Sequence, residues 1–209
     1  MSGEITAILL AAGESRRMGQ PKLLLPWGVT TVLGQVVSIF SSGLSSKLDQ
    51  RIDPVNEILI VTGGARALVE AEVARLAKQY PLRIVYNPNY AIGGMVSSIQ
   101  AGLMGLGPGT RAALIGLGDQ PQVREKTVRQ ICSVFEQTKS PIVIPSFQNR
   151  RGHPWLATRP LWPEIMALPS STTPRQFLDA HAEQIEYVPA DESILKDLDT
   201  PEDYNHQRP

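Results

Sequence analysis

The sequence predicts an α/β protein in which a mostly parallel, Rossmann-like sheet is covered by helices on both faces, giving three layers. Short apolar segments recur along the chain and are separated by amphipathic stretches, which is the alternation of strand and helix. The apolar segments are almost continuously hydrophobic, as is typical of strands that are buried on both faces. Ligands of such sheets bind at the carboxyl ends of the strands, so we expect the site in the loops that follow them.

The predicted strands are the apolar segments, and the predicted helices are the amphipathic segments between them. The strands cover residues 5–11, 57–63, 82–87, 112–119 and 141–146, and the helices cover 31–44, 65–80, 95–106 and 124–137. Residues 41–56 are polar and rich in serine, so we expect an exposed connection there. Beyond residue 158 the pattern becomes irregular, with short helices at 160–168 and 174–182, a strand near 184–190 and a closing segment at 196–204.

The amino-acid composition limits the classes of partner that this chain can bind. The chain of 209 residues is long enough for one well-packed domain covering residues 1–209, and its 20 basic residues balance 20 acidic ones. No net field therefore attracts nucleic acid or an anionic membrane. The first apolar run is too short to span a membrane, and we expect no signal peptide. A single cysteine, Cys132, lies in a helical pattern and suits the reducing cytoplasm.

The loop after the first predicted strand carries the clearest chemical signal. Gly13 and Gly19 bracket it, and glycine allows backbone N–H groups to approach a ligand closely. Arg17 and Lys22 add positive charge, and Arg16 could lie outside the site. The combination suits a polyphosphate, although a solvated turn with surface charges is the alternative. Neither known glycine-rich phosphate fingerprint is present, so the loop would bind phosphates in a third way.

These residues carry a resemblance to a known family. The stretch LLAAGESRRMGQPKLLLPWG resembles the signature L-x-A-G-x-S-x-R-M-G-x-x-K of the molybdenum cofactor nucleotidyltransferases, and more specifically of their cytidylyltransferase branch. Four further motifs of that family are matched in order by NPNYAIGGMVSSIQAGL, GLGDQP, RRGHP and DLDTPEDY. The resemblance extends from residue 8 to residue 204. It implies the fold of the nucleotide-diphospho-sugar transferases.

The resemblance also implies a reaction. CMP would be transferred from CTP to the phosphate of a molybdopterin-type acceptor, with Mg²⁺ as cofactor and pyrophosphate as the leaving group. Arg17, Lys22 and Asp119 would be the catalytic residues, since phosphoryl-type transfer depends on positioning and on the neutralisation of charge.

Two aspartates are the candidate metal ligands. Asp119 ends a predicted strand, and its carboxylate would suit Mg²⁺, although it could instead cap the next helix. The segment around Asp199 also has the pattern of a helix cap, with Thr200 as the capping residue. The resemblance implies that Asp199 completes the metal site opposite Asp119. Asp197 is a weaker candidate, which we expect to be solvated.

The nucleotide is expected to contact two segments. Gly94 and Ser98 begin a helix whose free N–H groups would face the crevice, although ordinary capping explains these residues equally well. By resemblance they would contact the base or ribose, together with the backbone of Ala11, Ala12 and Gly13. Family members that use guanine commonly have two glycines where this chain has alanines, so Ala12 favours cytosine.

His153 is the candidate residue on the acceptor side. It could contact the acceptor or be a structural histidine in a hairpin, and no Cys or His partner lies at zinc-ligand spacing. Trp155, Trp162 and Tyr187 are expected to be core or interface residues.

The sequence leaves three alternative functions open. The chain could transfer nucleotides to another phosphorylated metabolite, such as a sugar phosphate, because this fold serves many acceptors. It could be a regulator that binds nucleotides without catalysis, although Lys22 and Asp119 are both retained. A dinucleotide-dependent oxidoreductase would share the fold class but would need the glycine fingerprint that this chain lacks.

Overall fold

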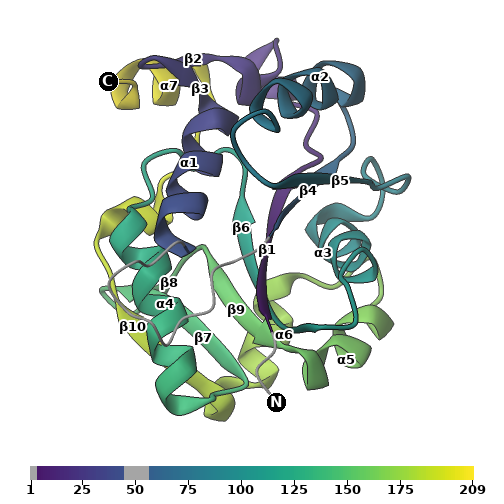
Figure 1. Ribbon diagram of the computed structural model, residues 1–209, viewed down its shortest axis with the longest axis vertical. Coiled ribbons are helices and arrows are strands. Elements are labelled where there is room, and N and C mark those ends of the chain that lie inside the picture. Colours follow the sequence, from purple (N-terminus) through teal and green to yellow (C-terminus); the bar gives the residue numbers. More distant parts are fainter. Residues whose placement is uncertain (1–3, 45–56) are drawn as a thin grey trace.

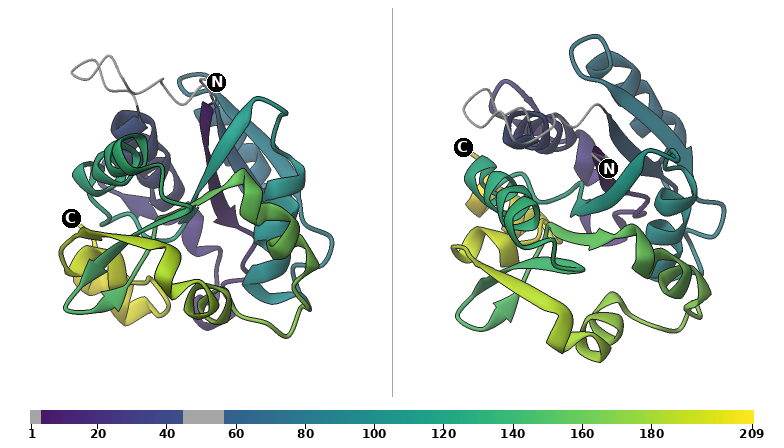
Figure 2. Two further views of the ribbon diagram at one scale, coloured as in Figure 1. Left: turned by 90° about the horizontal axis from the view of Figure 1, so that it is seen from below. Right: turned by 60° about the horizontal axis from the view of Figure 1, so that its bottom comes forward.

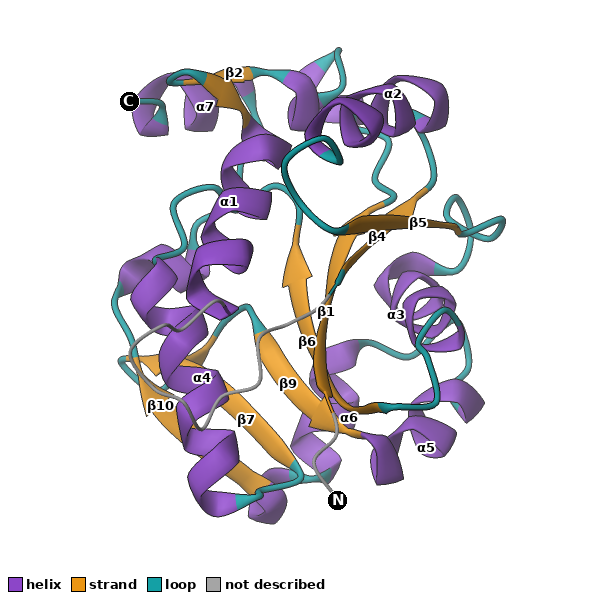
Figure 3. Ribbon diagram, in the orientation of Figure 1, coloured by secondary structure: helices purple, strands orange, loops and turns teal. Residues whose placement is uncertain are grey.

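The centre of the protein is a single sheet of eight strands. The structure, a computed structural model, describes residues 4–44 and 57–209. The strands follow the order β10-β7-β9-β6-β1-β4-β5, with β8 paired to β7 (Figure 1, Figure 3). Their bounds are β1 Glu4–Ala11, β4 Ile58–Thr62, β5 Leu82–Tyr86, β6 Thr110–Leu117, β7 Ile142–Phe147, β8 Arg150–Arg151, β9 Trp155–Thr158 and β10 Ile185–Pro189; β2 Pro26–Trp27 and β3 Thr30–Thr31 form a separate small sheet.

The sheet is mostly parallel, as predicted. Parallel pairs join β5 to β4, β4 to β1, β1 to β6, and β7 to β10, which Figure 2 shows as the yellow and green strands lying side by side. The antiparallel strand β9 lies between β6 and β7 and pairs with both. Four residues preceded by a proline give little periodic signal, so β9 was not expected from the sequence.

Helices cover both faces of the sheet, which confirms the three layers (Figure 1). Along β1, Ala7 and Leu9 belong to one hydrophobic cluster and Ile8 to the other, because successive side chains of a strand point to opposite faces. Helices α1, α2 and α4 contribute to the first cluster, and α3, α5 and α6 to the second. The helix bounds are α1 Val32–Leu44, α2 Arg66–Leu76, α3 Gly94–Met104, α4 Glu125–Thr138, α5 Trp162–Ala167, α6 Pro174–Ala180 and α7 Pro201–Gln207.

The strands and helices that the sequence predicts are all present, with differences at some boundaries. The helix predicted over 65–80 ends at Leu76, and the strand predicted from 112 begins at Thr110. Of the exposed connection predicted for 41–56, residues 41–44 are instead the last turn of α1, and residues 45–56 lie outside the described residues. In the described part of the chain, no helix is long and apolar enough to cross a membrane.

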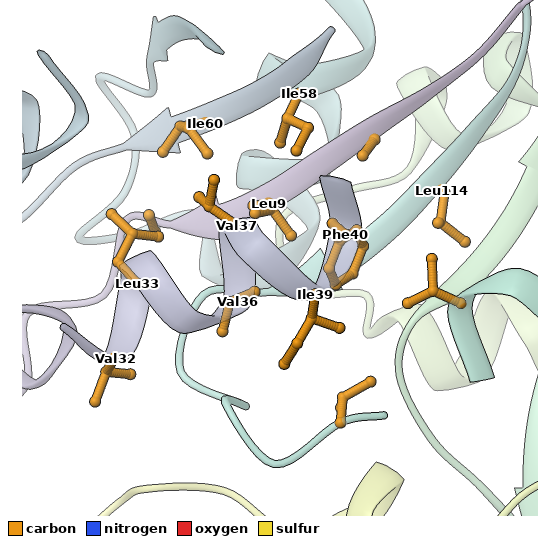
Figure 4. Packing of buried hydrophobic residues seen from close by; sticks show 14 of the residues in the cluster. Leu9, Val32, Leu33, Val36, Val37, Ile39, Phe40, Ile58, Ile60 and Leu114 are labelled. Atoms are coloured by element: carbon orange, nitrogen blue, oxygen red, sulfur yellow. The ribbon is translucent and has the colours of Figure 1, made fainter. Parts of the chain in front are cut away.

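Helix α1 packs tightly on the sheet. The hydroxyl of Thr31 accepts a hydrogen bond from the N–H of Gly34 at 3.0 Å and so caps the beginning of the helix. Further along, the ring of Phe40 lies near Leu9 and Leu114 (Figure 4). The ring fits because β6 has glycine at position 116, where a Cβ would collide with it.

We therefore expect Gly116→Ala to destabilise the protein. The added methyl group would force Phe40 out of its position, and overpacking of this kind costs about 1–3 kcal/mol in the free energy of unfolding. Denaturant titration measures this change. Gly109→Ala is the matched control, because a Cβ at that position meets no atom within 4 Å. Equal stability of the two variants would contradict the packing described.

Candidate active site

The loop after β1 is anchored to the core by apolar side chains. It contains two 3₁₀ turns, Arg16–Met18 and Lys22–Leu24, in which Met18 and Leu23 are buried. Gly19 has a φ of 66°, in the left-handed region that glycine adopts without strain. The hydroxyl of Ser15 accepts a hydrogen bond from the N–H of Lys22 at 3.1 Å. The cationic residues of the loop are therefore presented from a folded segment.

Two carboxylates from distant parts of the chain meet at this loop. Asp119 follows the end of β6, and β6 is the parallel neighbour of β1, so both strands deliver their carboxyl ends to the same edge. Asp199 precedes α7, where Thr200 forms a capping box with Asp203. The predicted cap at Thr200 is thus present, and the carboxylate of Asp199 remains available to the site.

Lys22 links the two carboxylates. Its ammonium forms an ion pair with Asp119 and lies 3.1 Å from Oδ1 of Asp199. Arg17 donates a hydrogen bond to the other oxygen of Asp199, Oδ2, at 2.8 Å. The side chain of Lys22 is only 13% exposed, whereas that of Arg17 is 70% exposed. The structure therefore brings all four predicted residues together.

The protein environment keeps Lys22 charged. Burial alone would lower the pKa of this ammonium, but the charges and hydrogen bonds of Asp119 and Asp199 outweigh burial and raise the pKa above its ordinary value. Lys22 is therefore a permanent cation at neutral pH.

Asp197 lies beside this network and accepts a hydrogen bond that the sequence did not predict. The residue is exposed to solvent, as expected, and one carboxylate oxygen also accepts a hydrogen bond of 2.8 Å from the buried side chain of Gln120. Burial of the carboxylate, together with the negative charges of Asp119 and Asp199, raises the pKa of Asp197 despite that hydrogen bond. The pairing with Gln120 depends on the fold and leaves no pattern in the sequence.

A pocket of about 340 Å³ opens over these residues. Its walls include Ala11 and Gly13 at the end of β1 and Ala91 from the loop after β5, as well as the four charged residues. Glu14 also lines it and forms a salt bridge of 2.6 Å with Arg16, an arrangement that sequence reasoning did not single out. The pocket thus combines a backbone turn, cations and carboxylates at the carboxyl ends of parallel strands.

The remaining predicted nucleotide contacts lie around this pocket or behind it. Ala12 is buried, and its carbonyl accepts a hydrogen bond from the N–H of Gly64 at 3.0 Å. Ser98 is also buried, and its hydroxyl accepts a hydrogen bond from the side chain of Asn87 at 3.0 Å. Gly94 begins α3 with a φ of 58° and is exposed. Ser98 therefore has a structural partner, and its contact with a nucleotide remains a prediction.

The pair of carboxylates fits a divalent cation. Asp119 and Asp199 already converge on a single positive group, the ammonium of Lys22. Within residues 4–44 and 57–209, no group of three His, Cys, Asp or Glu side chains is arranged to hold a metal. Two carboxylates with room for phosphate oxygens and water are the ligand set that Mg²⁺ commonly uses.

His153 lies in a second pocket, of about 900 Å³, between α6 and strands β7, β8 and β10. We call it the α6 pocket. Trp155 and Tyr187 also line it, while Trp162 is buried in the core. Trp155 is buried as expected, but the side chain of Tyr187 is 44% exposed, so the expectation of a core or interface position does not describe it within this chain. Burial lowers the pKa of His153 to about 4, so its imidazole is neutral at pH 7.

The fold and the site define a nucleotidyltransferase, and comparison with known proteins agrees. Residues 7–185 match the MobA-like NTP transferase domain, and the chain belongs to this family. The chain is 29% identical to the molybdenum cofactor cytidylyltransferase of Escherichia coli over 204 residues, which cover 96% of this chain and 93% of that protein. It is also 29% identical to the molybdenum cofactor guanylyltransferase of Mesorhizobium japonicum, over 78% of this chain and 69% of that protein.

Solved structures show the same architecture. The crystal structure of Rv0371c from Mycobacterium tuberculosis superposes with a TM-score of 0.81 at 26% identity and covers 99% of this chain and 98% of that one. A structure of Rv0371c in complex with manganese superposes with a TM-score of 0.76 at 24% identity, with the same coverage.

The neutral state of His153, whose Nε2 atom is buried, predicts a pH-dependent stability. The folded-state pKa of about 4 lies below the ordinary value of 6.5, so the unfolded chain binds the proton first as the pH falls. The contribution of this residue to the free energy of unfolding is therefore constant above about pH 6.5 and decreases by about 3 kcal/mol down to pH 4.

Denaturant titrations between pH 4 and pH 8 test this with the variant His153→Asn. The variant should lose stability less steeply than the wild type between pH 6.5 and pH 4, because asparagine does not titrate. Parallel stability curves for the two proteins would show that His153 is already charged or exposed.

Proposed function

We propose that this nucleotidyltransferase transfers CMP from CTP to the phosphate of a molybdopterin-type acceptor in the cytoplasm, with release of pyrophosphate and with Mg²⁺ as cofactor. The observation that carries the proposal is the convergence of Arg17, Lys22, Asp119 and Asp199 in one pocket at the carboxyl ends of β1 and β6. Together they supply what a triphosphate needs, which is fixed positive charge and carboxylates for a divalent ion.

The cationic side chains act on the phosphates. Lys22 is held as an ammonium at the floor of the pocket, and Arg17 extends from its exposed rim. Both can pair with oxygens of the triphosphate and offset the negative charge that builds up as pyrophosphate leaves. Because the loop is anchored by buried side chains, its backbone holds both residues at the pocket.

The carboxylates define the place of the divalent ion. Asp119 and Asp199 would hold it, and it would supply charge neutralisation at the phosphate that is attacked. An Rv0371c structure in complex with manganese supports a divalent ion in proteins of this fold. With the carboxylates engaged in this way, the ammonium of Lys22 is free to turn to phosphate oxygens in the same pocket.

The choice of cytosine rests on Ala12 and on the relatives. The match to the cytidylyltransferase covers 96% of this chain, against 78% for the guanylyltransferase. The methyl group of Ala12 also occupies space beside the β4–α2 turn, where Gly63 packs closely against it. Alanine leaves less room than the two glycines that guanine-using members commonly have, so it favours the smaller base, cytosine.

We expect Lys22→Ala to reduce turnover of CTP by about 10²–10³, the loss typical of one preorganised charge or donor at a transition state. Pyrophosphate release with Mg²⁺, CTP and a molybdopterin-type acceptor measures it. The control is Lys78→Ala, which removes an exposed lysine after α2. Wild-type rates for a folded Lys22→Ala protein would refute the proposed role.

We expect Ala12→Gly to weaken the preference for CTP over GTP by about tenfold, since loss of the buried methyl group behind the pocket frees the backbone there to make room for a larger base, and one methyl group changes discrimination by roughly that factor. The ratio of kcat/KM for the two triphosphates measures the preference. Ala190→Gly is the control and should keep the wild-type preference, because Ala190 lies in a loop outside the pocket. A wild-type enzyme that prefers GTP would overturn the cytidylyl assignment and leave the transfer mechanism intact.

A further inference from the structure

The acidic segment that precedes α7 is held by the side-chain amides of three glutamines. Gln120 donates a hydrogen bond of 2.8 Å to Oδ1 of Asp197. Gln207 donates one of 3.2 Å to the backbone carbonyl of Asp197, and Gln122 donates one to the backbone carbonyl of Lys196. Two of these glutamines lie in the loop that follows β6. Their amides therefore join this loop to the C-terminal segment.

Gln120 is placed to act on both carboxylates of the candidate metal site. It follows Asp119 directly in the chain, and its partner Asp197 lies two residues before Asp199. Leu198, between the two aspartates, is fully buried in the core, so packing fixes how deep this segment lies. The side chain of Gln120 is only 3% exposed and contacts the segment from the loop after β6. A change in this contact would therefore shift Asp199 relative to Asp119.

The amide of Gln120 holds the acidic segment without adding charge. Lys22 already pairs with Asp119 and Asp199, but it cannot keep them together once its ammonium turns to phosphate oxygens. The hydrogen bond between Gln120 and Asp197 does not involve Lys22 and can persist at that stage. A cationic side chain in place of Gln120 would also bind Asp197, but it would offset the negative charge that attracts a divalent ion. A neutral donor meets both requirements.

Stability alone does not explain a glutamine at position 120. Its Oε1 atom is buried and has no hydrogen-bond partner within residues 4–44 and 57–209, and the same is true of Oε1 of Gln122 and of Gln207. A buried acceptor without a partner costs about 1–3 kcal/mol. Methionine, an unbranched and adaptable side chain, would fill such a space without that cost. The presence of an amide therefore points to a role for its N–H donor.

We propose that Gln120 is a positioning residue of the divalent-ion site. Its hydrogen bond to Asp197 holds the C-terminal segment against the loop after β6, and so sets the separation of the carboxylates of Asp119 and Asp199. The inference rests on the proposed function, since it takes these two carboxylates as the ligands of the ion. Groups that orient metal ligands in this way typically contribute about 10–100-fold to metal affinity.

The test measures binding of Mn²⁺ to the full chain through the electron paramagnetic resonance signal of the free ion. Gln120→Met should raise the Kd for Mn²⁺ by about tenfold or more, because the contact that aligns the carboxylates is lost. Its free energy of unfolding without metal should equal or exceed that of the wild type, because the unpartnered acceptor is removed as well. Gln137→Met is the matched control, since Gln137 bonds only to Ser133 within α4, and it should bind Mn²⁺ like the wild type.

A reversed hydrogen bond tests whether the contact itself matters. The double variant Gln120→Glu with Asp197→Asn exchanges donor and acceptor and keeps the total charge. It should bind Mn²⁺ more tightly than Gln120→Met and close to the wild type. If Gln120→Met binds Mn²⁺ like the wild type, or if the double variant binds no more tightly than Gln120→Met, the inference is overturned. A loss of stability in Gln120→Met with an unchanged Kd would also overturn it, because the role would then be structural.

Pyrophosphate release separates this inference from the proposed function. With CTP and a molybdopterin-type acceptor, Gln120→Met should need about tenfold more Mg²⁺ for its half-maximal rate and should keep a kcat near the wild-type value at saturating Mg²⁺. If the wild type releases no pyrophosphate from CTP while the Mn²⁺ results are as expected, the nucleotide assignment fails and the positioning role stands. If CTP is turned over and Gln120→Met has the wild-type Kd for Mn²⁺, the positioning role fails and the proposed function stands.

Discussion

The ion pairs of Lys22 with Asp119 and Asp199 are the constraint on which the site depends. Two carboxylates brought close together repel each other, and a positive charge between them offsets this repulsion. The loop lysine supplies this charge in the protein alone, and a divalent ion can supply it in a complex. The same residue therefore keeps the two carboxylates in place and lies where the phosphates of a substrate would need a cation.

The C-terminal segment closes the site from outside the sheet. Asp199 reaches the pocket because α7 packs against the small sheet that follows the cationic loop, as Figure 1 shows at the end of the chain. The hydroxyl of Tyr204 donates a hydrogen bond of 2.6 Å to the carbonyl of Pro26, and its ring lies 6.4 Å from that of Trp27. The Thr200 cap fixes where α7 begins. Loop and C-terminal helix thus support each other, and any loosening of α7 would move one of the two carboxylates.

The sequence could predict the elements whose signal is local. Apolar strands and amphipathic helices predicted the three layers. The position of Asp119 after a strand predicted that it lies at the carboxyl edge of the sheet, where the structure has it. That Asp199 meets it depended on the family motif, because no spacing rule relates residues so far apart. Strand β9, the pairing of Asp197 with Gln120 and the exposed position of Tyr187 were beyond prediction. Each is determined by which segments pack together, and four-residue strands or single polar contacts have no periodicity of their own.

The charges of the two pockets suggest how substrate enters. The pocket at Lys22 is lined by three cationic side chains, Arg16, Arg17 and Lys22, and three anionic ones, Glu14, Asp119 and Asp199. Its formal charge is zero, so a bare triphosphate gains little by entering and meets two carboxylates at the floor. A triphosphate that carried a divalent ion would bring a partner for those carboxylates and would leave Lys22 available to the phosphates. The α6 pocket differs, because Arg150, Arg151 and Arg175 line it with a single carboxylate, Asp179, and its formal charge is positive. Nucleotide binding at Lys22 should therefore depend on a divalent ion.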